Sequence, residues 1–280
     1  MVEGVDGRML STVFFGLGLA CTLQPSGRTA TFLRVRFACT DDEVLRAERG
    51  LLRNQVHPGI DPARAGNICD LLQSRLSLSE PELKNVVLKR PSVLGYSYEA
   101  NIAQSLAALQ SRLSLSEPEL KKMVLGLPAV LGCSYEANIA PSLGALQSRL
   151  SLSEPELKKV VLGIPPVLGC SFEANIGPTL DFMETAFGLA PEELRKRVVA
   201  NPTLLSRSLE LRYHPRVAIA SALGVVVARK TLNPTAMYTD PKFMVWLRIR
   251  EQLGLADEDW AALCALPAVE RADSVHNRLR

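Results

Sequence analysis

The chain has 280 residues, of which 47% are hydrophobic and 5% aromatic, so it can bury a sizeable core built mainly from Leu, Val and Ala. The scarcity of aromatic residues favours helix-on-helix packing over a β-sandwich or barrel. A formal net charge of +3 excludes a chain-wide polybasic signature, and no run of 18 apolar residues indicates a membrane span. The cysteines and histidines show no metal-ligand spacing, so neither a metal nor a cofactor is expected.

Residues 1–40 have the composition of a targeting segment. No acidic residue occurs between Asp6 and Asp41, whereas arginines punctuate Ser, Thr and Ala over the same stretch. An apolar run from Met9 to Leu23 is similar to the core of a signal peptide, and the two features together would suit two-step import into a plastid. We therefore expect a mitochondrial or plastid protein and leave residues 1–40 out of the predicted fold.

A repeat with a period of 37 residues dominates the middle of the chain, since SLSEPEL begins at Ser77, Ser114 and Ser151, and GLAPEEL begins at Gly188. Positions that persist even in the divergent fourth unit should pack between neighbouring units. They form five columns: Leu83, Leu120, Leu157 and Leu194; Val87, Val124, Val161 and Val198; Leu94, Leu131, Leu168 and Leu205; Leu106, Leu143, Leu180 and Val217; and Pro91, Pro128, Pro165 and Pro202. The clear repeats therefore span about residues 77–223.

Each unit is predicted to contain two helices joined by a short helical turn. In the first unit, Ser79 and Glu82 have the spacing of a capping box, which starts a helix that must end before Pro91. A short turn follows, and Ser97 is the expected cap of a second helix. Its predicted buried face consists of Ile102, Leu106, Leu109 and Leu113.

The flanking segments are predicted to extend this stack. A degenerate unit is expected from about Asp41 to Leu76, where Ile68 and Leu72 continue the spacing of the second helix. After Leu223 the register breaks, and a helical repeat domain over residues 41–250 is expected to be followed by a cap or tail over residues 251–280. Trp246 and Trp260 are interpreted as apolar anchors of this end. The whole is predicted to be an all-α solenoid without a sheet.

The repeat resembles that of the mitochondrial transcription termination factor (mTERF) family. The matching pattern is L-x-L-S-x-x-E-L-x-x-x-V, then P-x-x-L, then S-x-E-x-N-I. In the first unit it is carried by Leu76, Leu78, Ser79, Glu82, Leu83, Val87, Pro91, Leu94, Ser97, Glu99, Asn101 and Ile102. Pro215-Arg216 is similar to the way that family closes a repeat, and residues 238–243 are similar to its final segment.

The resemblance implies a right-handed superhelical stack of three-helix motifs, each with two long helices and one short one. It also implies a non-catalytic protein that binds double-stranded DNA or RNA along a basic concave groove in mitochondria or chloroplasts. Its roles would be transcription termination or regulation, intron splicing or ribosome assembly. A monomer without membrane contact is expected, together with possible contacts to other organellar expression factors.

Cations recur at the period of the repeat and should therefore stack into columns. The candidate phosphate ligands on the first helices are Lys84, Lys121, Lys158 and Arg195, flanked by Lys122, Lys159 and Lys196. Arg75, Arg112 and Arg149 form a further column. The alternative is that these side chains complement helix dipoles and solvate the surface, and the sequence leaves both interpretations open.

The segment from Arg207 to Arg250 holds eight cations against two acids, a local excess of +6. Its candidate phosphate ligands are Arg207, Arg212, Arg216, Arg229, Lys230, Arg248 and Arg250. Arg212 and Arg216 are four residues apart, so a helix would present both on one side, and neither belongs to an apolar column. The strongest binding of nucleic acid is therefore predicted here.

No catalytic constellation is apparent. Glu99, Glu136, Glu173 and Glu210 recur once per unit, which indicates a capping or inter-repeat role rather than acid–base chemistry. An α-solenoid can also serve as a protein-interaction scaffold, and this alternative to nucleic-acid binding stays open.

Overall fold

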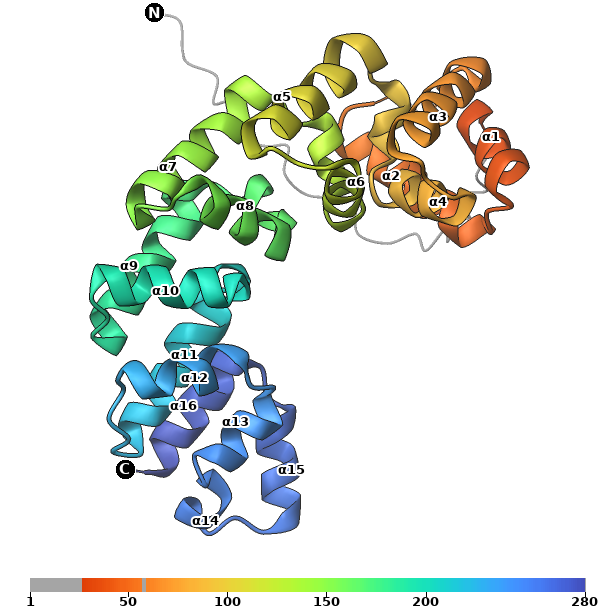
Figure 1. Ribbon diagram of the computed structural model, residues 1–280. Helices are drawn as coiled ribbons and strands as arrows, with labels where there is room; N and C mark the ends of the chain where they lie inside the picture. Colours follow the sequence, from red (N-terminus) through yellow and green to blue (C-terminus); the bar gives the residue numbers. More distant parts are fainter. Residues whose placement is uncertain (1–26, 57–58, 280) are drawn as a thin grey trace, which may run out of the picture.

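The computed structural model describes residues 27–56 and 59–279, and within these ranges the chain is helical with no β-strand (Figure 1). The predicted all-α class is confirmed. Sixteen α-helices occur in the described residues, interleaved with short 3-10 helices and π-helical turns. The architecture follows directly from the 37-residue repeat.

Each clear unit contains a first helix, a 3-10 helix, a π-helical turn and a second helix. The first helices are α4 (Glu80–Lys89), α6 (Glu117–Gly126), α8 (Glu154–Gly163) and α10 (Pro191–Ala200). The 3-10 helices are η1 (Pro91–Gly95), η3 (Pro128–Gly132), η5 (Pro165–Gly169) and η7 (Pro202–Ser206). The π turns are η2 (Tyr98–Ala103), η4 (Tyr135–Ile139), η6 (Phe172–Ile176) and η8 (Leu209–Tyr213). The second helices are α5 (Gln104–Leu113), α7 (Ala140–Leu150), α9 (Gly177–Phe187) and α11 (His214–Ala222).

The predicted start and end signals of the helices are confirmed. The Glu82 carboxylate accepts a hydrogen bond from the Ser79 backbone N–H at 2.7 Å, and the same capping box recurs at Ser116 and Ser153. The helix ends at Lys89, just before Pro91, because proline disfavours a helical residue in front of it.

The second helices begin with a feature that the sequence did not indicate. The Ser97 hydroxyl caps the helix by accepting from the Ala100 N–H at 3.3 Å, as predicted. The Ile102 N–H, however, donates to the Ser97 carbonyl at 3.3 Å, five residues back, so the first turn is a π turn. The same turn opens all four second helices.

The predicted apolar columns form one continuous core. Every member of the Leu83, Val87 and Leu94 columns is buried, as are three of the four members of the Leu106 column. Val217 is the exception and is only partly buried, because the fourth unit packs against the C-terminal helices rather than another repeat. Glycine ends two of the first helices and lets the 3-10 helix of the next unit approach closely: a Cβ at Gly163 would lie 2.8 Å from Cγ of Pro202.

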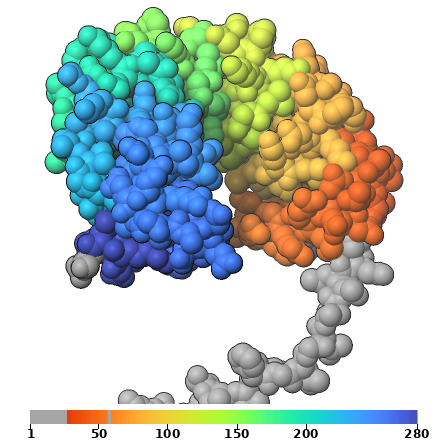
Figure 2. Space-filling view, turned by 90° about the horizontal axis from the view of Figure 1, so that it is seen from below, coloured from red at the N-terminus to blue at the C-terminus, as the bar shows by residue number. Residues whose placement is uncertain are grey.

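The units stack into an arc whose two sides differ (Figure 1). Successive first helices pack directly against one another on the inner side, and successive 3-10 helices do the same. The second helices lie on the outer side, where α5 and α7 each contact the π turn of the following unit. Seen from below, the chain encloses a hollow between its N-terminal and C-terminal helices (Figure 2).

The fold begins earlier than residue 41. Helix α1 (Arg28–Phe37) buries Leu33 completely and packs on α2 (Asp41–Arg53) and α3 (Pro62–Leu76), the helices of the expected degenerate unit. It ends in the left-handed conformation at Ala38 (φ 47°), as α3 and α5 do at Ser77 and Ser114. Helix α1 is therefore the second helix of a still earlier unit. Of the expected targeting segment 1–40, residues 28–40 belong to the fold and residues 1–26 lie outside the described residues.

The last four helices form a second core with α11 that crosses the expected boundary at residue 250. They are α13 (Asp240–Trp246), α14 (Ile249–Leu253), α15 (Asp257–Ala265) and α16 (Ala268–Arg278). Before them, α12 (Leu232–Met237), which follows η9 (Arg229–Thr231), joins the repeat core through Leu232 and Ala236. Helix α16 packs on α11, the last repeat helix, and Val275 is fully buried. Trp246 and Trp260 pack against this core, as predicted. Residues 251–279 are therefore an integral cap.

Candidate nucleic-acid interface

The first helices carry two adjacent columns of cations with different surroundings. In the paired column, each side chain reaches back to the glutamate that closes the preceding capping box. The nitrogen–oxygen distances are 3.0 Å for Lys84–Glu43, 2.8 Å for Lys121–Glu82, 2.8 Å for Lys158–Glu119 and 2.5 Å for Arg195–Glu156. Lys121 also donates to the Ser77 carbonyl at 2.9 Å, at the end of α3. The paired column links successive units, which accounts for its recurrence without a nucleic acid.

The pairing lowers the pKa of the capping glutamates. Hydrogen bonds from the Lys121 side chain and the Ser79 backbone lower the pKa of Glu82 to about 2, and those from Lys158 and Ser116 do the same for Glu119. A carboxyl group with a lower pKa in the folded state stabilises the fold above its unfolded pKa. That contribution is lost as the pH falls through the folded value.

We expect the double variant Glu82→Gln/Glu119→Gln to have a lower Tm than the wild type at pH 7. The gap should shrink between about pH 4.5 and pH 2, because the wild-type carboxylates become protonated and lose their ion pairs over that window. Thermal melts across this range measure the gap. The control Glu258→Gln/Glu270→Gln removes two exposed carboxylates that have no ion pair among the described residues and act only on the helix dipoles of α15 and α16, so its Tm should fall less than that of the double variant. A gap that stays constant with pH would contradict the account.

The exposed column consists of Lys122, Lys159 and Lys196, one on each of α6, α8 and α10. Within the described residues Lys122 and Lys159 have no ion pair, whereas Lys196 lies 3.4 Å from Glu192 with 66% of its side chain exposed. Lys122 and Lys159 line a shallow groove of about 370 Å³ between α6 and α8. These side chains stand on the inner row of helices, where a ligand could run along the arc.

Arg46 extends the exposed column toward the N-terminus and was missed from the sequence. Thr40 and Glu43 form the same capping box as Ser79 and Glu82, so Arg46 on α2 is equivalent to Asn85 on α4, which interrupts the column. The spacing here is 39 residues (43 to 82) rather than 37, which hides the equivalence. The capping boxes, aligned with each other, would have revealed it.

The column of Arg75, Arg112 and Arg149 is fully engaged in inter-repeat contacts. Arg75 forms an ion pair with Glu117 and donates to the Gln110 side chain at 2.6 Å, and Arg112 repeats both contacts one unit later with Glu154 and Gln147. Arg149 pairs with Glu184 at 2.6 Å and with Asp181 at 2.8 Å. These arginines hold neighbouring units together.

Arg216 requires a correction, because it is a buried structural residue. It is 3% exposed, donates to the carbonyl oxygens of Thr235 and Tyr238 at 2.8 Å each, and forms an ion pair with Asp240. Its guanidinium lies 4.7 Å from the ring centre of Phe243. A side chain held in this way cannot reach a phosphate, so Arg216 is not the phosphate ligand that the sequence predicted.

Three of the six other C-terminal candidates are also engaged within the protein. Arg212 is half-buried and donates to the Tyr238 carbonyl at 2.9 Å, so it binds the cap as Arg216 does. Arg248 pairs with Glu251 at 3.0 Å, and Arg250 pairs with Asp257. Three candidates have no ion pair within the described part of the chain: half-buried Arg207 and exposed Arg229 and Lys230. Four of the seven candidate cations of this segment are therefore held by contacts within the protein.

The region of the chain that matches a known family contains all the clear repeats. Residues 51–243 match the model of the mTERF family. The chain belongs to the mTERF family. A comparison with curated proteins finds no match for this chain.

The mTERF repeats of this chain keep their recurring acids at the surface. Glu99, Glu136, Glu173 and Glu210 are exposed in the π turns that open the second helices.

In the described residues, no group of three or more His, Cys, Asp or Glu is placed to hold a metal ion. The search of the same residues finds no helix with both the length and the apolar character needed to cross a membrane.

Proposed function

We propose that this mTERF protein is a non-catalytic regulator of organellar gene expression that binds nucleic acid along the inner side of its arc. The observation that carries the proposal is the exposed column, which presents one lysine on each of the successive first helices α6, α8 and α10. The cations beside it are taken up by ion pairs between units. Regularly spaced lysines on the inner row of helices can neutralise successive phosphates of a double-stranded DNA or RNA backbone.

Phosphate contact rather than base readout is the expected mode of binding. Units two and three carry nearly the same surface side chains, and identical side chains cannot read different bases. The proposal includes the right-handed superhelical path expected of the family. It also includes a monomer in mitochondria or plastids that acts in transcription termination, intron splicing or ribosome assembly. Residues 1–26 remain the proposed targeting segment.

The test compares the wild type with the variant Lys122→Ala/Lys159→Ala/Lys196→Ala. At 0.1 M salt, loss of three phosphate contacts should weaken binding to a DNA or RNA duplex about 100-fold, with an unchanged Tm because the three side chains are exposed. The control Arg28→Ala/Lys242→Ala/Arg278→Ala removes the same charge away from the inner row of first helices and should lose far less affinity. Equal losses in the two variants would reduce the effect to net charge and contradict the proposal.

A further inference from the structure

Two adjacent grooves open on the outer side of the arc, at the junctions between the first three clear units. The first, of about 320 Å³, lies between α5 and the short helices η3 and η4. The second, of about 420 Å³, lies between α7 and η5–η6. Most residues that line the second are equivalent to those of the first, one period later, and Cys133 lines both. We call these the outer grooves.

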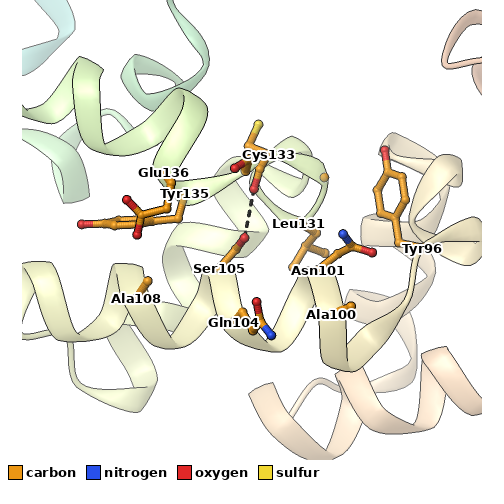
Figure 3. A pocket seen from close by; sticks show the side chains of 12 residues that line it. Tyr96, Ala100, Asn101, Gln104, Ser105, Ala108, Leu131, Cys133, Tyr135 and Glu136 are labelled. Atoms are coloured by element: carbon orange, nitrogen blue, oxygen red, sulfur yellow. Dashed lines mark hydrogen bonds between the residues drawn. The ribbon is translucent and has the colours of Figure 1, made fainter.

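The outer grooves are lined by a mixture of polar, small apolar and aromatic side chains. In the first groove, Asn101 projects from η2 and Gln104 and Ser105 from α5, and the Ser105 hydroxyl donates to the Cys133 carbonyl at 3.1 Å (Figure 3). Tyr96 and Tyr135 stand at its two ends. In the second groove, Cys133 takes the place of Tyr96, and this smaller side chain accompanies the larger cavity.

The junctions on either side are filled by the protein itself. Toward the N-terminus, Arg64 stands at the position of Asn101 and donates across the junction to the Gly95 and Tyr96 carbonyls at 3.1 and 3.4 Å. Toward the C-terminus, Phe182 stands at the position of Ala108 and packs on the His214 ring with 4.8 Å between ring centres. The near-identical middle units therefore create two similar grooves one period apart, which suits a ligand that is itself repetitive.

Each outer groove carries one carboxylate, Glu136 in the first and Glu173 in the second, and neither lining contains Lys or Arg. Within the described residues, neither carboxylate has a basic partner, and Glu173 only accepts a hydrogen bond from the Ser171 hydroxyl at 3.2 Å. The capping glutamates of the same units, by contrast, are all in ion pairs. Each outer groove thus carries a local negative charge on a chain of net charge +3.

We propose that the outer grooves dock an extended, basic peptide segment of a partner protein. One basic side chain would enter each groove to meet Glu136 or Glu173, and the amide and hydroxyl groups of Asn101, Gln104 and Ser105 would bind its backbone. Packed helical units repeat about every 10 Å, and a chain in the extended polyproline-II conformation covers about 3.1 Å per residue with three residues per turn, so every third side chain points the same way. The matching ligand therefore carries a basic residue at every third position. This site is independent of the lysines on the inner side.

The test uses two fluorescent peptides of equal composition in a polarisation titration. One has arginine at every third position with Gly and Ser between, and the other has its arginines in a block. The spaced peptide should bind the wild type more tightly. Glu136→Gln/Glu173→Gln should weaken it about tenfold, since two partly exposed ion pairs are lost. The control Glu258→Gln/Glu270→Gln should bind as the wild type does.

A groove-filling variant separates shape from charge. Ala108→Phe adds an aromatic ring to the first groove, as Phe182 does at the equivalent position one junction beyond the second groove. The variant should therefore bind the peptide less tightly while the protein stays folded. The Lys122→Ala/Lys159→Ala/Lys196→Ala variant should bind the peptide with the affinity of the wild type. The groove variants should bind duplex nucleic acid with the affinity of the wild type. Equal binding of the two peptides, or no loss in the glutamine variant, would overturn the proposal. Loss of single-stranded RNA binding in both groove variants would identify the grooves as base-binding and overturn it as well.

Discussion

Replacing Arg216 with alanine should lower the free energy of unfolding by about 3 kcal/mol. The side chain is 3% exposed and satisfies Asp240 and two backbone carbonyls between α12 and α13. Removing one partner of a buried ion pair typically costs about 3–5 kcal/mol, because the other partner is left uncompensated. Asp240 is partly exposed and keeps a second ion pair with Arg271 at 2.9 Å, which places the effect at the lower end.

Chemical denaturation followed by circular dichroism measures this loss. Arg248→Ala is the matched control, because Arg248 is exposed and its ion pair with Glu251 spans a single helical turn. Pairs of that kind contribute about 0.5 kcal/mol or less. Similar losses in the two variants would show that Arg216 is not the link between the last repeat and the cap.

Replacing Leu120 with alanine should cost about 2–5 kcal/mol through the cavity that it leaves in the core. Leu120 is fully buried in a column shared by four units, so its neighbours on both sides lose contacts. The same denaturation experiment on Lys122→Ala, two residues along the same helix, should show a far smaller loss because Lys122 is exposed. Equal losses would mean that the buried face of α6 is wrongly assigned.

The helices could be predicted from sequence because their signals are local. A capping box, a proline that ends a helix and apolar residues at i, i+3 and i+4 act within a few residues, and the repetition of the pattern shows which of them the fold needs. The π turns were not predicted, since the choice between a four-residue and a five-residue hydrogen bond at Ser97 leaves no mark on the apolar pattern. Helix α1 was missed because its arginines suit a targeting segment as well as they suit a surface helix.

The roles of the cations could not be read in the same way. Lys121 and Lys122 are adjacent and recur with the same period, yet the first meets Glu82 of the preceding unit and the second faces solvent. That difference depends on how units stack, which no single unit encodes. Arg216 was misjudged for a similar reason: its partners lie 19 to 24 residues away, beyond the end of the repeat. Its place in the Pro215-Arg216 pair reflects the closure of the repeat stack by the cap.

The salt dependence of binding tests the central claim most directly. For a B-form DNA duplex, each phosphate contact contributes about 0.9 to the slope of log Kobs against log salt concentration. The wild type and the Lys122→Ala/Lys159→Ala/Lys196→Ala variant should therefore differ in slope by about 2–3 in parallel titrations on the same duplex. Slopes that are the same in both proteins would show that the inner lysines do not contact phosphates, and would contradict the account.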